Sequence, residues 1–215
     1  KGGEPKCLVD YWSQRLVEEL AACKEAGTEP PVYTTSKGMA DALIAFLFAS
    51  QDASTGSLNW ILAFLSTWPD ILAKVRDEQK RLRPNNEPLD FETVEKMTYT
   101  KAVVLEALRF RPPAPMVPMI TGGDVAITDD YVIPKDTLVF PSLSSACREG
   151  FPNPHEFDPD RMMPDRQEHV KYRENFLPFG VGAHYCPGRE YAINHVIAFV
   201  AVFVTELDWE RKATP

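Results

Sequence analysis

The feature that most constrains the fold is a stretch from about 37 to 67 that is apolar on nearly every side. It contains the runs DALIAFLFA and LNWILAFL. A helix that is hydrophobic all round belongs inside a protein core. With 215 residues, 44% of them hydrophobic, the chain is long enough to bury a core of this kind. We therefore expect a globular protein with this segment at its centre.

A polar patch, SQDASTGS, interrupts the middle of that stretch. Buried hydroxyls, amides and carboxylates cost free energy unless a partner satisfies them, so one continuous buried helix would need partners for the patch. The alternative is two helices joined by a Ser/Thr/Gly turn, with Ser54 or Ser57 as the N-cap of the second. Composition alone favours neither interpretation.

Three further segments predict helices. Apolar residues at helical spacing from about 8 to 24 indicate a half-exposed helix that ends near Gly27. A start signal at Thr67, Pro69 and Asp70 precedes an amphipathic surface helix that stops at PNNEP. Another helix from about 100 to 110 must end before the double proline that follows.

The second half of the chain is rich in loops. Its short pieces DVAIT, DYVIP and TLVFP favour strands of a small sheet. A closing helix is indicated from Cys186, with Pro187 in the first turn, to about Glu206, and its apolar run VIAFVAVFV predicts burial. The expected fold is mainly α with a small β-sheet, in a single domain that covers residues 1–215.

Charge and hydropathy argue against two classes of partner. Lys and Arg number 23 and Asp and Glu 31, for a net charge of −8, which repels phosphate backbones, so we expect no nucleic acid partner. The longest apolar runs, 42–49 and 196–204, fall short of the roughly 18 residues of a membrane span. The chain starts at Lys1 without the apolar core of a signal peptide, so we expect an upstream portion to be missing. Four widely spaced cysteines predict reduced thiols.

Two motifs offer charged residues that could meet in the fold. Glu106 and Arg109 have the spacing E-x-x-R, which places opposite charges on one helix face. Many surface helices carry such pairs, so the pair needs a third partner in an apolar setting to gain a role. Arg161, in FDPDRM, offers a planar fork of five donors that would complete a cluster and pin the loop to the helix.

The motif FGVGAHYCPG carries the strongest chemical signal. Gly180 and Gly182 allow tight turns and a close backbone approach to a flat ligand, just before Cys186. A thiolate at a helix N-terminus is favoured by the dipole, and its soft sulfur suits iron as an axial ligand. A lone cysteine more often packs as a small apolar residue, but the glycines favour the ligand interpretation. Zinc is disfavoured because His184 and Cys186 lack a second ligand pair.

The remaining histidines carry no such pattern. We expect structural or solvated roles for His155, His169 and His195.

In order and spacing, these motifs resemble the C-terminal half of the haem-thiolate monooxygenases, the cytochrome P450 family. The resemblance covers nearly the whole chain. It implies that Cys186 is the proximal ligand of haem iron, that Glu106, Arg109 and Arg161 form a structural cluster, and that the 37–67 helix crosses the distal haem face. It also implies that His184 reaches a haem propionate. The implied haem-binding residues are Phe179, Gly180, Gly182, His184, Cys186 and Gly188.

Within that family, FASQDAST, YTKAVVLEALRFRPPAPMVP and TDDYVIP are similar to the sterol 22-desaturases of fungi and to related algal and plant enzymes. The resemblance implies an oxidoreductase that removes two hydrogens from a sterol side chain, forming the 22,23 double bond. Such an enzyme uses molecular oxygen and NADPH-derived electrons delivered by a reductase, at the endoplasmic reticulum membrane.

The distal helix departs from the commonest pattern of the family. Ser50 stands where Gly is usual, and Ala53 stands where a Thr helps to deliver protons to bound oxygen. Losing a positioned proton donor costs on the order of 10² to 10⁴ in rate, so either Ser54 or Thr55 substitutes or the chemistry needs that proton less. Asp52 keeps its acidic place. The sterol desaturases share the alanine.

Length supplies a second hypothesis. Family members are much longer than 215 residues, and the half without a counterpart here would contribute part of the haem pocket. The alternative to a catalytic role is therefore a non-catalytic subunit of a larger assembly, with other chains covering an exposed apolar face.

Overall fold

The computed structural model describes residues 4–210 and 212, in two compact units that divide between Gln51 and Asp52. Lys1, the basis for expecting an upstream portion, lies outside the described residues. No described helix is both long enough and apolar enough to cross a bilayer.

The first unit is built from α1 (Leu8–Ala26), the short 3-10 helix η1 (Val32–Thr34) and the first part of α2 (Ser36–Thr67). The predicted helix from 8 to 24 is confirmed. It ends where Gly27 adopts φ 67°, a left-handed conformation that glycine reaches without strain. Between α1 and α2 lies an apolar groove of about 1050 Å³, lined by Trp12 and Phe46 among others.

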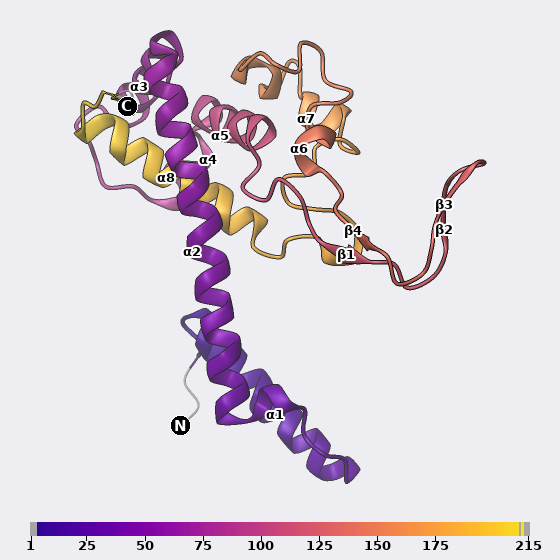
Figure 1. Ribbon diagram of the computed structural model, residues 1–215. Coiled ribbons are helices and arrows are strands. Elements are labelled where there is room, and N and C mark those ends of the chain that lie inside the picture. The colour runs from indigo at the N-terminus through magenta and orange to yellow at the C-terminus, as the bar shows by residue number, and fades with distance from the viewer. Residues whose placement is uncertain (1–3, 211, 213–215) are drawn as a thin grey trace. The chain divides into compact units, whose positions relative to one another are not determined.

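One continuous helix, α2, spans 32 residues, which decides between the two interpretations of its polar patch (Figure 1). The patch is tolerated for two reasons. The Ser57 hydroxyl donates to the Ala53 carbonyl at 2.9 Å, so the helix backbone satisfies it. Gln51, Asp52 and Thr55 are exposed to solvent and need no internal partner.

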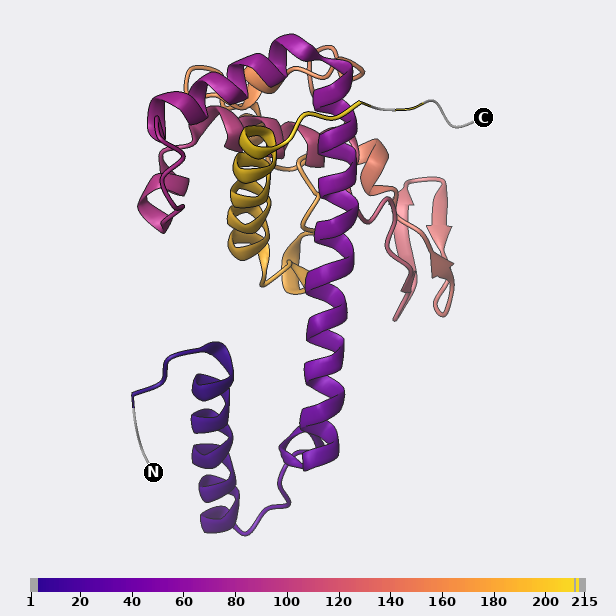
Figure 2. The same cartoon turned by 90° about the vertical axis from the view of Figure 1, so that its left-hand side faces the viewer.

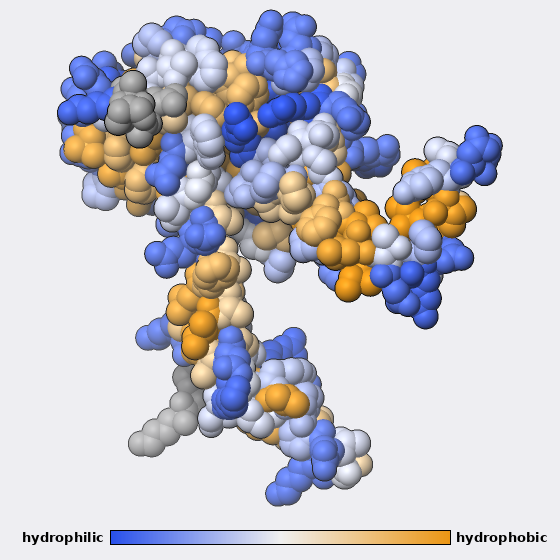
Figure 3. Space-filling model, in the orientation of Figure 1, coloured by the Kyte–Doolittle hydropathy of each residue, from blue (hydrophilic) through white to orange (hydrophobic). Residues whose placement is uncertain are grey.

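The expectation that all of α2 is buried was wrong for its first half. Apolar side chains there are exposed (Figure 3), whereas those of the second half belong to the main core. The hydropathy of a helix does not show how many neighbouring elements it packs against. The second half of α2 packs with α3, α5 and α8. In the first unit, the other described elements are α1 and η1. The exposed residues are Ile44, Phe46, Leu47 and Phe48; the buried ones are Leu58, Ile61, Phe64 and Leu65.

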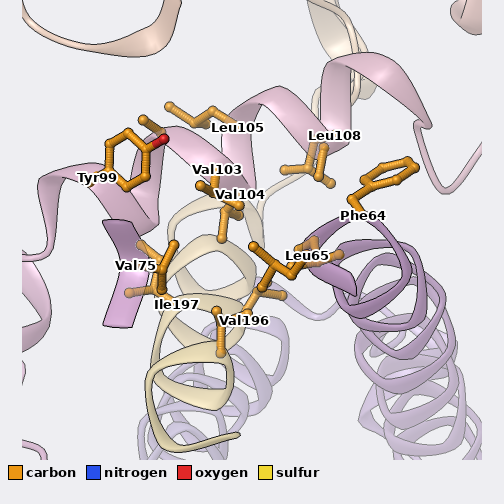
Figure 4. Close-up of a cluster of buried hydrophobic side chains, with 14 of the residues drawn as sticks. Phe64, Leu65, Val75, Tyr99, Val103, Val104, Leu105, Leu108, Val196 and Ile197 are labelled. Atoms are coloured by element: carbon orange, nitrogen blue, oxygen red, sulfur yellow. The ribbon is translucent and has the colours of Figure 1, made fainter. Parts of the chain in front are cut away.

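Helices dominate the second unit. They are α3 (Pro69–Leu82), α4 (Phe91–Glu95), α5 (Thr98–Phe110), α6 (Leu143–Ala146), α7 (Glu168–Lys171) and α8 (Arg189–Glu206), with 3-10 helices η2 (Pro159–Met162) and η3 (Gly182–His184). The core forms where α3, α5 and α8 meet (Figure 2), and Figure 4 shows their apolar side chains converging with those from the end of α2. Almost every residue of α5 from Tyr99 to Arg109 is buried.

The N-terminus of α5 is capped by a side chain from another helix. Glu78 of α3 is 2% exposed, and its carboxylate accepts the backbone N–H groups of Tyr99 and Thr100 at 2.7 and 2.8 Å and the Thr100 hydroxyl at 2.7 Å. The first N–H groups of a helix lack intrahelical partners and attract negative charge, which explains the burial of this carboxylate. The prediction of α3 as a surface helix therefore missed its buried polar face.

The predicted small sheet is two separate antiparallel pairs. One joins β1 (Met119–Ile120) to β4 (Leu138–Val139), with Met119 opposite Val139. The other is a hairpin of β2 (Val125–Thr128) and β3 (Tyr131–Ile133). The mainly helical fold with small antiparallel sheets agrees with the sequence.

Replacing Glu78 tests the cap. Glu78→Ala leaves two buried N–H groups and a hydroxyl without their acceptor, so we expect the free energy of unfolding to fall by about 3 kcal/mol. Urea denaturation followed by circular dichroism measures it. The exposed neighbour Asp77→Asn is the matched control and should change stability by less than about 0.5 kcal/mol. Equal, small effects of the two variants would contradict the role of Glu78.

Candidate functional site

The Glu106–Arg109 pair is fully buried rather than on a helix surface. Arg109 donates from Nε to Glu106 Oε2 at 2.7 Å and from Nη2 to Oε1 at 2.8 Å, and both side chains are 0% exposed. This bidentate geometry is the strong form of a charged pair. The pair lies on α5 within the core, the apolar setting in which a third partner gains importance.

Arg161 of η2 is that third partner. Its Nε donates to Glu106 Oε1 at 3.1 Å, and its side chain is 1% exposed. The structure thus brings Glu106, Arg109 and Arg161 together, although Arg161 is 55 residues from Glu106 along the chain.

The two guanidinium groups hold the loop between α6 and η2 through its carbonyl oxygens. Arg109 donates to the carbonyls of Pro154 and Glu156 at 3.0 and 3.1 Å. Arg161 donates to the carbonyl of Pro152 at 2.8 Å. Because these loop carbonyls receive buried donors, the loop is fixed although it has no regular secondary structure.

Aromatic packing fixes the same loop from another side. Phe157, the first residue of FDPDRM, lies 4.8 Å from the rings of both Phe64 and Trp68 and 5.8 Å from Phe110. Pairs at this spacing add stability beyond their buried area. The motif FDPDRM therefore contributes Phe157 to the aromatic cluster and Arg161 to the cluster of charged residues.

Two opposed effects act on the Glu106 carboxyl. Burial raises its pKa, while the hydrogen bonds and charge of Arg109, the Asp158 amide and the charge of Arg161 lower it. In this ion-pair network the donors of Glu106 favour its charged form, against the effect of burial.

The sequence interpretation missed a fourth member, Glu168. This residue, 6% exposed, accepts from Arg161 Nη1 at 2.8 Å and from Arg166 Nη2 at 2.6 Å. Arg166 also donates to Asp158 Oδ2 at 2.7 Å. The one signal in the sequence is that Arg161 and Glu168 are seven residues apart. Spacing alone does not predict the contact, because the two residues are joined by a loop whose path the sequence does not specify.

The cysteine loop turns twice through left-handed glycines. Gly180 has φ 74° and Gly182 has φ 68°, conformations that side-chain-bearing residues rarely adopt. The Cys186 N–H donates to the Phe179 carbonyl at 2.9 Å, which closes the loop between the two residues. Cys186 is a free thiol, partly exposed at the end of this loop.

Cys186 lies just before α8, not in its first turn. The helix begins at Arg189 with Gly188 as N-cap, so the expected start at Cys186 and Pro187 was wrong. The Cys186 N–H belongs to the loop closure with Phe179.

This donor set fits a single thiolate ligand. The described residues contain no group of three or more His, Cys, Asp or Glu side chains placed to hold a metal ion together. The Cys186 residue is partly exposed, and a Cβ added at Gly188 would lie at ordinary contact distance, 3.9 Å, from its Sγ. His184 in η3 is exposed on the same loop, and Phe179 packs partly against the core.

Of the three expected catalytic residues of α2, two are exposed and one is buried. Asp52 and Thr55 are exposed and lie three residues apart on one side of the helix. Ser54 is 8% exposed and belongs to the buried side. The catalytic assignment of all three stays a prediction.

Comparison with known proteins identifies the family. Residues 13–215 match the family model described as Cytochrome P450. Cytochrome P450 710A2 of Arabidopsis thaliana is 42% identical over 212 residues, which are 98% of this chain and 42% of that protein. C-22 sterol desaturase erg5 of Aspergillus fumigatus is 38% identical over 229 residues, covering 100% of this chain and 44% of that protein.

A solved structure agrees with the sequence relatives. The crystal structure of the cytochrome P450DA heme domain has a TM-score of 0.66 at 27% identity, covering 71% of this chain and 34% of that one. The chain belongs to the cytochrome P450 family, whose cofactor is haem with a thiolate ligand to iron. It spans about two fifths of the length of the curated relatives that it matches.

The bidentate geometry at Arg109 can be tested by Arg109→Lys. Lysine keeps the charge but cannot make two parallel bonds to Glu106 and also reach the loop carbonyls. We expect the free energy of unfolding to fall by about 3 kcal/mol, as for a broken buried pair. Chemical denaturation measures it, with Arg173→Lys at an exposed position as the control. Equal stability of the two variants would show that the fork geometry is not needed.

His169 predicts a pH dependence of stability. Burial lowers its pKa, and Arg189 and Lys101 lower it further, so the unfolded chain binds the proton more readily than the folded one. The free energy of unfolding that depends on neutral His169 is therefore fully present above the ordinary histidine pKa of about 6.5 and is lost as the pH falls below it. We expect denaturation at about pH 7.5 and about pH 5.5 to show a smaller acid loss in His169→Gln than in the parent chain.

The control for this prediction is His155→Gln, which removes an exposed histidine. It should keep the acid loss of the parent chain. An unchanged acid loss in His169→Gln would refute the prediction.

Proposed function

We propose that this chain is the haem-binding portion of a cytochrome P450 that desaturates a sterol side chain at the 22,23 position. The observation that carries the proposal is the loop at Cys186, which turns through two left-handed glycines and is closed by the bond from the Cys186 N–H to the Phe179 carbonyl. The buried cluster of Glu106, Arg109 and Arg161 in the same unit supports it.

Cys186 would hold the haem iron through its thiolate. Phe179, Gly180, Gly182 and Gly188 would border the ring, with His184 directed to a propionate. Bound there, haem supplies the activation of molecular oxygen, and the thiolate donates electron density that favours O–O cleavage. The chain's own task is to keep the sulfur in place and to exclude competing ligands.

The substrate class comes from the named relatives. Proteins called C-22 sterol desaturase, from Aspergillus fumigatus and Gibberella zeae, are 34% to 38% identical and align with nearly all of this chain. The plant relative at 42% identity carries no substrate in its name. The sterol assignment therefore rests on the desaturases together with the motifs FASQDAST and TDDYVIP.

Partners and location follow from the same proposal. Electrons would originate in NADPH and arrive through a reductase, and the enzyme would work at the endoplasmic reticulum membrane. On the distal helix, the exposed Asp52 and Thr55 are better placed than the buried Ser54 to move protons to and from solvent.

An alternative role as a structural subunit is favoured by one observation. The first half of α2 exposes a row of large apolar side chains, a surface that in an assembly would be covered by other chains.

The carbon monoxide difference spectrum of the reduced chain tests the proposal, since thiolate-ligated haem alone gives a strongly red-shifted Soret band. We expect that band after reconstitution of the chain with haem, and at least a tenfold loss of it in Cys186→Ala, because the substitution removes the sulfur proposed to bind the iron. The exposed Cys7→Ala is the matched control and should keep the band.

Two outcomes would overturn the proposal. The first is a red-shifted band that survives in Cys186→Ala. The second is a folded chain that takes up no haem at all, which would favour the structural subunit.

A further inference from the structure

We propose that Glu168 is a positioning residue for Cys186: its carboxylate anchors the segment 172–186 to the buried arginine cluster. The geometry around Arg161 points to this role. The inference rests on the proposed function for its link to haem, and it concerns a residue outside the motifs of the sequence.

Charge balance is the first argument. Arg109 and Arg161 are both essentially inaccessible to solvent, and Glu106 alone can neutralise only one of them. An uncompensated buried charge is strongly destabilising. Glu168, with a side chain 8% exposed, is the second carboxylate, so two guanidinium groups face two carboxylates.

The hydrogen bonds around Glu168 close a ring. One carboxylate oxygen accepts from the buried Arg161 and the other from the partly exposed Arg166. Arg166 binds the Asp158 carboxylate, and the Asp158 amide donates to Glu106, to which Arg161 also donates. Glu168 is thus the point at which the buried cluster connects to the chain beyond η2.

A series of short-range backbone bonds continues from Glu168 toward the cysteine. The Glu168 carbonyl accepts from the Tyr172 N–H at 2.8 Å, and the Tyr172 carbonyl accepts from the Phe176 N–H at 3.0 Å. Further on, the Phe179 carbonyl accepts from the Cys186 N–H at 2.9 Å. Each of these bonds spans only a few residues, and Tyr172, Phe176 and Phe179 pack partly against the core. Glu168 adds to this packing the charged anchor at the beginning of the segment.

The role of Glu168 differs from that of Arg161. If the Glu168 side chain is removed, Arg161 still binds Glu106 and the carbonyls of Pro152 and Asn153. The loop before η2 therefore keeps its anchor, and the loss falls on the segment after α7.

Hydrogen exchange of the haem-free full chain, resolved by peptide, tests this directly. In Glu168→Ala we expect exchange in 172–186 to rise at least about tenfold, and by clearly more than in α3 and the second half of α8. Glu168→Asp, which keeps the charge, should restore most of the protection. Glu174→Ala, at an exposed position in the same segment, should leave exchange unchanged.

A second variant separates the two ion pairs of Glu168. Arg166→Ala removes the outer partner but leaves the bond to Arg161, so it should preserve the protection of 172–186. If Glu168→Ala does not fold, Glu168→Gln takes its place: it keeps one acceptor oxygen and should give an intermediate, still local, rise in exchange.

Three results would overturn the inference: unchanged exchange in Glu168→Ala or in its substitute, a rise of equal size in α3 and α8, or an equal rise in Arg166→Ala. In the haem-loaded chain, the positioning role also predicts a smaller red-shifted fraction per bound haem in Glu168→Ala, a signature that stability alone would not change. The exchange experiment needs no haem, so failure of the proposed function leaves its result standing.

Discussion

Two guanidinium groups in a protein interior impose conditions on everything around them. Removing Arg109 and Arg161 from water costs several kcal/mol each, which only paired charges and well-aligned acceptors offset. Glu106 and Glu168 supply the charges, and the carbonyls of the loop before η2 supply further acceptors. Buried donors thereby satisfy the carbonyls of a loop that has no regular secondary structure.

The residues that fix the scaffold are distinct from the loop that carries the thiol. The charged cluster and the aromatic cluster around Phe157 fix the scaffold, while the cysteine loop carries the glycines and the half-exposed thiol. A metal ligand works best when the surrounding protein sets its position and limits solvent access. The charged groups of the scaffold are among the most deeply buried polar residues in the described part of the chain.

Helix ends show a similar use of buried charge. The N-terminus of α5 has no capping side chain of its own, and Glu78 from α3 takes that place. The helix that carries Glu106 and Arg109 is therefore fixed at its start by one carboxylate and near its end by another. Both carboxylates lie in the core, where unpaired they would be strongly destabilising.

The sequence by itself determined the helices, because apolar periodicity and proline or glycine stops are local signals: α1, α3 and α5 lie within a few residues of their predicted bounds. Its motifs also led to the family and to the Glu106–Arg109–Arg161 cluster. Only the tertiary structure decided which half of α2 is buried, that Glu78 caps α5, and that Glu168 joins the cluster. Those outcomes depend on contacts between residues far apart in the chain or across loops, whose paths no local pattern encodes.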